Sequence, residues 1–151
     1  MKVEEKLASM GITLPETSPP KALLVPVKQV GNIIYVSGQL PMRNSELAYT
    51  GKVGDTRTIE EAQDAARLCI IGAMAAMKTY LGDLDKVKNI IKVQAFVASH
   101  VGFDKQPIVI NAASQLLIDA FGEPGRHART ALGTNQLPMD ATVEIELIAE
   151  V

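Results

Sequence analysis

The sequence of 151 residues has the length of one domain and can bury a hydrophobic core without disulfide bonds. Hydrophobic residues make up 47% of the chain, which excludes a disordered protein. The net charge is −2, aromatic residues make up 4% and tryptophan is absent. Nucleic-acid binding usually needs basic patches and stacking surfaces, so this composition argues against it.

The single cysteine, Cys69, lies among apolar residues and has no partner for an intramolecular disulfide, so we interpret it as a buried structural thiol. No apolar run approaches the roughly 20 residues of a membrane span, and residues 1–10 are charged and unlike a signal peptide. The sequence therefore predicts a cytoplasmic protein without a membrane segment.

The N-terminal third predicts one helix and two strands. Residues 1–10 have the spacing of a short amphipathic helix, and the prolines that follow predict an extended connector. We expect strands over Ala22–Lys28 and Asn32–Ser37, joined by a turn at residues 30–32. The segment Met42–Asp55 is rich in turn-forming residues and predicts irregular structure, with a short strand near Leu47.

A long helix is predicted after Thr58, because Thr58 and Glu61 form a capping box and Gly82 suits the helix end. Its expected buried stripe consists of Ile59, Ala62, Ala66, Cys69, Ala73, Ala76 and Tyr80.

The C-terminal half predicts a strand, a helix and two further strands. In the strand Asn89–Ser99, a row of Ile91, Val93, Ala95 and Val97 alternates with a second row. A second helix is expected from about Pro107 to Gly122, followed by strands over Ala128–Gly133 and Thr142–Val151. This order predicts an α+β fold with two main helices on one face of a mixed sheet. The uncovered face favours association with further copies of the chain.

The last two strands carry the first candidate site. Arg129 shares a strand face with Ala131, whereas Glu144 and Glu146 lie on one face of the final strand. If the two strands pair, the arginine and the carboxylates gather on one surface. An arginine fork binds a substrate carboxylate through two parallel hydrogen bonds. A structural ion pair from Arg129 to Glu144 or Glu146 is the alternative, and the spacing alone favours it.

Ser37–Gly38–Gln39 is a second candidate, because a glycine after a strand lets a ligand approach the backbone, although the sequence alone favours an ordinary strand-ending turn. His100 and His127 lack the spaced partners of a metal site. We read His100 as a strand-end residue and expect His127 to be exposed, with a place beside a pocket as the alternative. No phosphate-binding loop or nucleophile elbow is present in the sequence.

From about Ala22 to the end, the chain resembles the RidA family, also called YjgF or endoribonuclease L-PSP. The resemblance rests on Gly31–Pro41 (GNIIYVSGQLP), the helix after Thr58, Lys92–Val97, the Ala128–Arg129–Thr130 triplet, Leu137–Pro138 and Val143–Ala149. On this basis we assign residues 1–21 to an N-terminal helix and connector, and residues 22–151 to a RidA-like domain.

The resemblance implies a chorismate-mutase-like fold assembled as a barrel-like homotrimer with ligand clefts between subunits. It also implies hydrolysis of small 2-imino or 2-enamino acids to 2-keto acids and ammonia, without a metal or cofactor. Arg129 would then anchor the substrate carboxylate and Glu144 would position water. Ser37, Gly38, Ala131 and Asn111 would line the cleft.

Two positions depart from the family pattern. Leu24 stands where active deaminases commonly have tyrosine, and Ala131 stands where a cysteine or a small polar residue is common. Three functions follow, the first two of which use the same cleft. The first is deamination, the second is binding of small carboxylate metabolites without catalysis, and the third and weakest is RNA cleavage.

Overall fold

The computed structural model describes residues 2–19 and 23–151, and a five-stranded sheet is its central element. β5 and β6 run parallel to each other, and the other neighbouring strands are antiparallel. In spatial order the strands are β1 (Val27–Val30), β2 (Ile33–Gln39), β7 (Val143–Glu150), β5 (Asn89–Ala98) and β6 (Ala128–Thr134).

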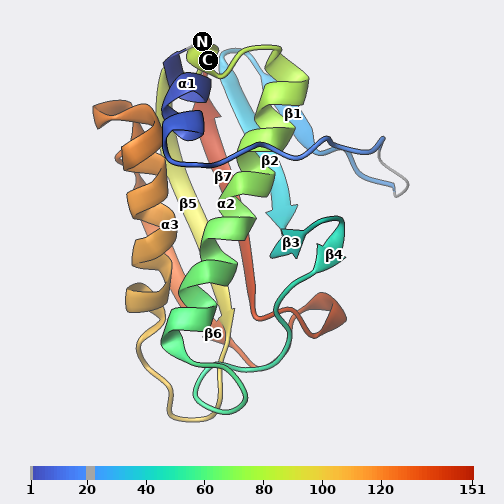
Figure 1. Ribbon diagram of the computed structural model, residues 1–151, viewed down its shortest axis with the longest axis vertical. Helices are drawn as coiled ribbons and strands as arrows, with labels where there is room; N and C mark the ends of the chain where they lie inside the picture. Colours follow the sequence, from blue (N-terminus) through green and yellow to red (C-terminus); the bar gives the residue numbers. More distant parts are fainter. Residues whose placement is uncertain (1, 20–22) are drawn as a thin grey trace.

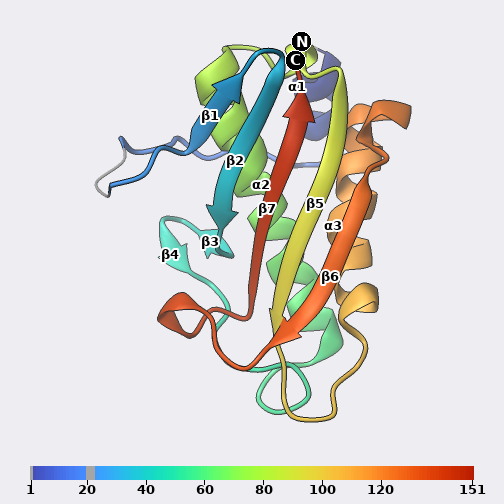
Figure 2. The ribbon, with the colours of Figure 1, turned by 180° about the vertical axis from the view of Figure 1, so that it is seen from behind.

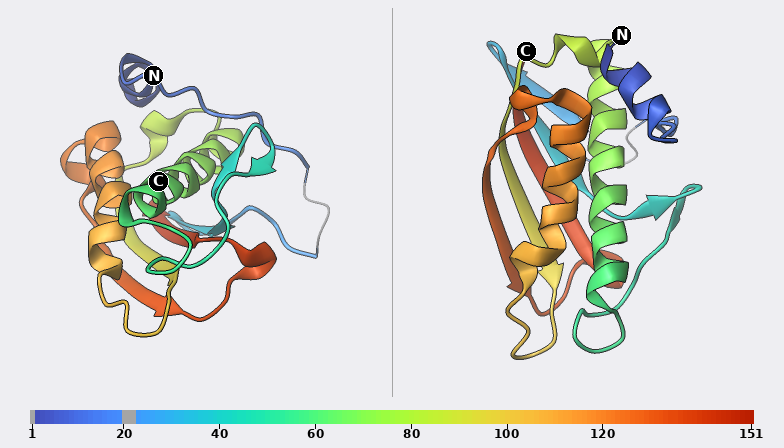
Figure 3. Two further views of the ribbon diagram at one scale, coloured as in Figure 1. Left: turned by 60° about the horizontal axis from the view of Figure 1, so that its bottom comes forward. Right: turned by 60° about the vertical axis from the view of Figure 1, so that its left-hand side comes forward.

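Two long helices, α2 (Ile59–Leu81) and α3 (Gln106–Phe121), cover one face of this sheet (Figure 1 and, edge-on, Figure 3). Figure 2 shows the other face, over which none of the described helices lies. The predicted α+β arrangement is therefore confirmed. Short helical turns complete the chain: η1 (Leu84–Lys86), η2 (Glu123–Gly125) and η3 (Pro138–Asp140).

The N-terminal helix α1 (Lys2–Ser9) packs against α3 and η1. The Asp85 carboxylate of η1 accepts hydrogen bonds from the backbone N–H groups of Lys2 and Val3 at 2.7 and 2.9 Å. These bonds occupy two N–H groups that the first turn of a helix leaves unpaired. A residue more than 80 positions away thus caps α1.

α2 begins and ends where the sequence predicted. Thr58 Oγ1 accepts from the Glu61 N–H and Glu61 Oε1 accepts from the Thr58 N–H, both at 3.1 Å, and Gly82 ends the helix with a φ of 82°. The small residues of the predicted stripe are buried against the sheet. The expectation that Tyr80 is buried is wrong. The residue is 48% exposed, because it reaches the rim of the sheet, where its hydroxyl donates to Gln29 Oε1 of edge strand β1.

The first strand begins at Val27, five residues later than Ala22, which lies outside the described residues. Pro26 precedes the strand, and its carbonyl accepts the Ser37 N–H at 2.9 Å. Proline has no N–H to give in return, so the ladder stops there. Leu23, Leu24 and Val25 consequently remain exposed.

β5 changes register at its start, so Ile91 does not share the environment of Val93, Ala95 and Val97, with which the sequence grouped it. The pairing with β7 shifts between Ile90 and Lys92, which turns Ile90 into the core and leaves Ile91 38% exposed. Such a shift inserts one unpaired residue and reverses the faces before it. The rest of the row, Val93, Ala95 and Val97, is buried as expected.

The segment after β2 holds a hairpin, β3 (Met42–Arg43) and β4 (Glu46–Leu47), so only its second strand was anticipated. Asn44 and Ser45 both have positive φ angles, 53° and 64°, as a two-residue type I′ turn requires.

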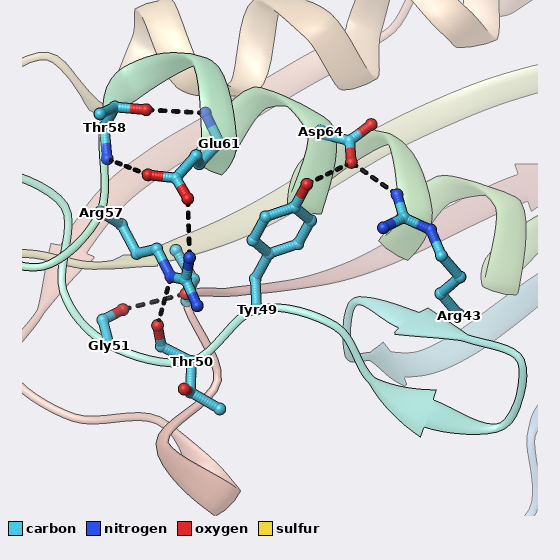
Figure 4. Close-up of polar contacts among 9 residues, drawn as sticks. Arg43, Tyr49, Thr50, Gly51, Arg57, Thr58, Glu61 and Asp64 are labelled. Atoms are coloured by element: carbon cyan, nitrogen blue, oxygen red, sulfur yellow. Dashed lines mark hydrogen bonds and ion pairs between the residues drawn. The ribbon is translucent and has the colours of Figure 1, made fainter.

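Tyr49, in the loop that follows β4, connects this loop to α2 (Figure 4). Its hydroxyl donates to Asp64 at 2.6 Å, and Arg43 donates to the same carboxylate oxygen at 2.7 Å. The guanidinium carbons of Arg43 and Arg57 lie 5.8 and 5.3 Å from the Tyr49 ring centre, within cation–π range. Burial raises the pKa of Asp64, but the bonds from Tyr49 and Arg43 outweigh burial and the pKa is lowered.

Candidate functional site

Arg129 lies at the start of β6, the edge strand, and is held by two neutral side chains of α3. Its Nη1 donates to Asn111 Oδ1 at 2.9 Å and to Ser114 Oγ at 3.1 Å. Asn111 and Ser114 are three positions apart and therefore share one face of α3. A guanidinium has five N–H donors, and these two bonds use both protons of Nη1. The Nε–H and the two protons of Nη2 have no acceptor among the residues that the structure describes.

No acidic side chain in the described ranges forms an ion pair with Arg129. The alternative of a structural ion pair with Glu144 or Glu146 is therefore wrong for the single chain. The Arg129 side chain is only partly buried, so its charge is uncompensated and open to solvent. A cation in this state suits an anionic ligand.

His127 extends the Arg129 network, and the expectation of an exposed histidine is wrong. Its Nε2 lies 2.9 Å from Ser114 Oγ, and its Nδ1 lies 2.6 Å from the Gly125 carbonyl oxygen. The residue is partly buried. Burial lowers the pKa of His127, the Gly125 carbonyl raises it and the nearby Arg129 lowers it, with a net decrease. The imidazole is therefore neutral at physiological pH.

Glu144 belongs to a second polar group, on the uncovered face of the sheet. Its neighbours in β7, Val143 and Ile145, point into the core, so Glu144 points away from the helices. Burial raises the pKa of this carboxyl, and the nearby Glu146 raises it further. A raised pKa makes the carboxylate a better proton acceptor than an ordinary glutamate.

Gly38 lies directly against Glu144, as a bulge in the pairing of β2 with β7 allows. A side-chain carbon placed on Gly38 would come within 2.6 Å of Glu144 Oε1. Ser37 is adjacent, and its hydroxyl donates to the Val25 carbonyl at 2.7 Å. Gly38 and Glu144 thus lie side by side, with Ser37 next to Gly38 in the chain.

The two groups do not meet within one chain, because β6 and β7 are not neighbours. β5 lies between them, with Val93 opposite both Arg129 and Leu147, and Phe96 opposite Glu144. Strand spacing then separates the backbones of Arg129 and Glu144 by about 10 Å across the sheet and about 10 Å along it. Arg129 shares its face with buried Val93, whereas Glu144 shares the open face with Phe96. The sequence placed both residues on one surface only if the last two strands pair, and this condition is not met within the chain.

The remaining candidates take structural places. Ala131 is partly buried on the Arg129 side of β6 and packs against the core. Cys69 is fully buried with its thiol 3.6 Å from the Val143 carbonyl, and burial raises its pKa well above the ordinary value. His100 is exposed, and the described residues contain no cluster suited to a metal ion.

Sequence reasoning missed Ser114. The signal was available, since Ser114 follows Asn111 by three positions in a predicted helix and must lie beside it. The bond from His127 to Gly125 gave no such signal, because it depends on the turn at η2.

A cavity of about 490 Å³ lies elsewhere, between the N-terminal connector, β1 and the end of α2, lined by residues such as Thr17, Val27 and Ala76. None of the described helices is both long and apolar enough to cross a membrane.

Residues 4–151 match the model of the YjgF/chorismate mutase-like endoribonuclease family. That description belongs to the family and assigns no reaction to this chain. Among solved structures, the Agrobacterium tumefaciens protein Atu1372, described as having unknown function, is 45% identical. The match covers 99% of this chain and 92% of that one, with a TM-score of 0.92.

Two curated relatives extend the comparison. Protein TCP17 of Trypanosoma cruzi is 41% identical over 99% of this chain and 94% of its own length. A 2-iminobutanoate/2-iminopropanoate deaminase of Dermatophagoides farinae is 32% identical over 80% of this chain and 79% of its own length. The match over nearly the whole chain and the shared fold lead to one conclusion: the protein is a member of the YjgF/RidA family.

Proposed function

We propose that the protein hydrolyses small 2-enamino and 2-imino acids of the 2-aminoacrylate type to 2-keto acids and ammonia. The observation that supports this most is the free Nε–Nη2 edge of Arg129, whose charge no described residue of the same chain balances. This edge presents two parallel N–H groups, which match the two oxygens of a carboxylate. The D. farinae relative, named for 2-imino acid deamination, agrees with this substrate class.

The complete site forms between two copies of the chain. Arg129 and Glu144 lie on different faces of one sheet, so they can meet only if unlike surfaces of two copies come together. A contact of this kind closes into a ring when the rotation allows it, and a trimer is the closed form that we infer. The exposed Val25 lies beside Ser37, and together with the exposed Leu23 and Leu24 it offers apolar area to such a contact.

The reaction needs positioning and proton transfer. The CH2 carbon of 2-aminoacrylate takes up a proton, which gives the 2-iminium form. Water then adds to C2, and the nitrogen leaves as ammonium, which yields pyruvate. Arg129 of one copy holds the carboxylate, and Glu144 of the next copy takes a proton from the water and returns it to the nitrogen. The raised pKa of Glu144 suits both steps.

Binding without catalysis is the second candidate. Leu24 is 57% exposed and Ala131 has no polar group, so neither supplies the hydroxyl or thiol that active relatives carry at these positions. Such a protein would bind 2-keto acids at Arg129 and release them unchanged.

One experiment separates the two candidates. The purified protein is added to a pyridoxal-phosphate enzyme that releases 2-aminoacrylate, and the formation of pyruvate is followed against buffer. Deamination predicts a faster rate that Arg129→Ala and Glu144→Gln each abolish. Binding without catalysis predicts no rate above buffer, together with saturable binding of 2-ketobutyrate. Absence of both would refute a carboxylate site.

A further inference from the structure

The polar contacts around Arg129 form a continuous chain of hydrogen bonds with one assignable direction. The Gly125 carbonyl can only accept, so His127 Nδ1 carries the proton and donates. In the neutral imidazole Nε2 is then an acceptor, and the Ser114 hydroxyl donates to it. Arg129 can only donate, so the Ser114 oxygen accepts from Nη1.

We propose that His127, as its neutral Nδ1–H tautomer, is a positioning residue that keeps the lone pairs of Ser114 directed at Arg129 and thereby fixes the guanidinium plane. Rotation of the guanidinium would exchange its edges. With Nη1 held by both Asn111 and Ser114, the Nε–Nη2 edge stays free for the ligand. This inference rests on the proposed function, because it explains how the carboxylate anchor of the same site is oriented.

Gly125 gives the arrangement a rigid end point. It is buried in η2, and a side-chain carbon at this position would meet the Leu117 backbone oxygen of α3 at 2.3 Å. Only glycine allows the two backbones to approach this closely. The carbonyl that selects the His127 tautomer is therefore fixed to the same helix that carries Asn111 and Ser114.

Protonation of His127 would disturb this arrangement. Nε2 would then donate to Ser114, whose own proton would lose its acceptor, and a second cation would stand beside Arg129. From β6, Arg129 is the charged group that acts on His127. On the neighbouring elements, the charges of Glu123 and Arg126 pair with each other at 3.1 Å, and Asp119 accepts from Gln115. Lys92 of β5 stands opposite Ala128. We therefore expect the guanidinium of Arg129 to be held less firmly on acidification.

Two variants interrupt the hydrogen-bond chain at different points. His127→Asn retains a donor for Gly125 but is too short to reach Ser114, and Ser114→Ala removes the hydroxyl that joins His127 to Arg129. Ser114→Thr retains this hydroxyl and should rescue the site. His100→Asn and Ser9→Ala make the same chemical changes at exposed positions and are the matched controls.

NMR tests the arrangement with and without ligand. In the wild type we expect the Nδ1–H tautomer for His127 and separate, slowly exchanging Nη resonances for Arg129. His127→Asn and Ser114→Ala should merge the Nη resonances and weaken 2-ketobutyrate binding about fivefold to tenfold, as loss of one ordinary hydrogen bond predicts. The slow Nη exchange of the wild type should be lost at acid pH along the NMR titration of His127, and this pH dependence should be absent in His127→Asn.

An Nε2–H tautomer would overturn the inference, as would unchanged Nη exchange in both variants. Unchanged affinity in both variants, while the wild type binds and Arg129→Ala does not, would overturn it too. A different result would refute the proposed function: a wild type that neither binds 2-ketobutyrate nor turns over 2-aminoacrylate. The NMR signature of the free protein decides the inference in that case also.

Discussion

The carboxylate of Glu144 occupies the space in which a side chain on Gly38 would begin, 2.6 Å from the position of its first carbon. Gly38 has no positive φ angle, so alanine fits the backbone there. What gives way is the end of the Glu144 side chain, which is flexible. Glycine at this position therefore sets where the carboxylate of Glu144 stands.

Gly38→Ala should displace this carboxylate without unfolding the protein. We expect the rate of 2-aminoacrylate hydrolysis to fall at least about tenfold, because misplacing a catalytic group by about 1 Å can cost as much as 100-fold. The melting temperature should change by only a few degrees. Gly72→Ala is the matched control, since a carbon there meets Gln39 Oε1 at 2.8 Å on the helix-covered side of the sheet. Equal rates in Gly38→Ala and Gly72→Ala would show that Gly38 does not position Glu144 for the reaction.

Arg129→Ala and Arg129→Lys should both fold normally, because Arg129 balances no carboxylate of its own chain. Alanine should weaken 2-ketobutyrate binding roughly 10- to 150-fold, which corresponds to loss of a charged hydrogen-bonded contact of about 1.5–3 kcal/mol. Lysine retains the charge but not the planar fork, so it should restore only part of the affinity. Calorimetric titration measures both variants, and wild-type affinity in Arg129→Ala would return the residue to a structural role.

Glu144→Gln should make the folded chain more stable at neutral pH while it removes turnover. Burial and the nearby Glu146 raise the pKa of Glu144 in the folded state. Its contribution to stability is therefore present at low pH and is lost as the pH rises through the folded pKa. Glutamine does not ionise, so the variant does not lose this stability as the pH rises. Urea unfolding at pH 7 and pH 4 should show a gain for the variant at the higher pH, and a destabilised variant at pH 7 would contradict the assignment.

His127 predicts a pH dependence of stability. Its folded-state pKa lies below the ordinary value of 6.5, chiefly because of burial, so the unfolded chain binds the proton more readily. Stability is therefore fully present above pH 6.5 and falls as the pH drops through the folded pKa. Unfolding curves between pH 7.5 and pH 5 should show this decrease in the wild type and in His100→Asn. His127→Asn should be flatter over the same range, and a parallel decrease in that variant would assign the effect to other groups.

Local signals in the sequence predicted local structure well. The capping box at Thr58 and the glycine at position 82 fixed both ends of α2, because capping depends on residues within one turn. The hairpin turn at Asn44–Ser45 was not predicted, since serine is an uncommon residue for the second positive φ angle of a type I′ turn. The register shift after Ile90 was not predicted either, because Ile90 and Ile91 each suit either face of a strand.

The arrangement of the candidate site residues differs from the one considered in the sequence. Consecutive strands are usually neighbours, which is why Arg129 and Glu144 were expected to share a surface. The crossover from β5 through α3 places β6 outside β5, and β7 instead enters between β2 and β5. That insertion joins segments more than 100 residues apart, and no local pattern encodes it. The partners of Arg129 likewise come from α3 and depend on how that helix lies on the sheet.

β5 separates Arg129 on β6 from Glu144 on β7, and this separation has a genetic consequence. Because each proposed cleft draws its guanidinium from one polypeptide and its carboxylate from the next, two inactive alleles can complement each other. Arg129→Ala and Glu144→Gln subunits, unfolded and refolded together, should regain part of the wild-type rate, whereas each refolded by itself should stay inactive. Dilution that dissociates the assembly should abolish the rate of the wild type as well.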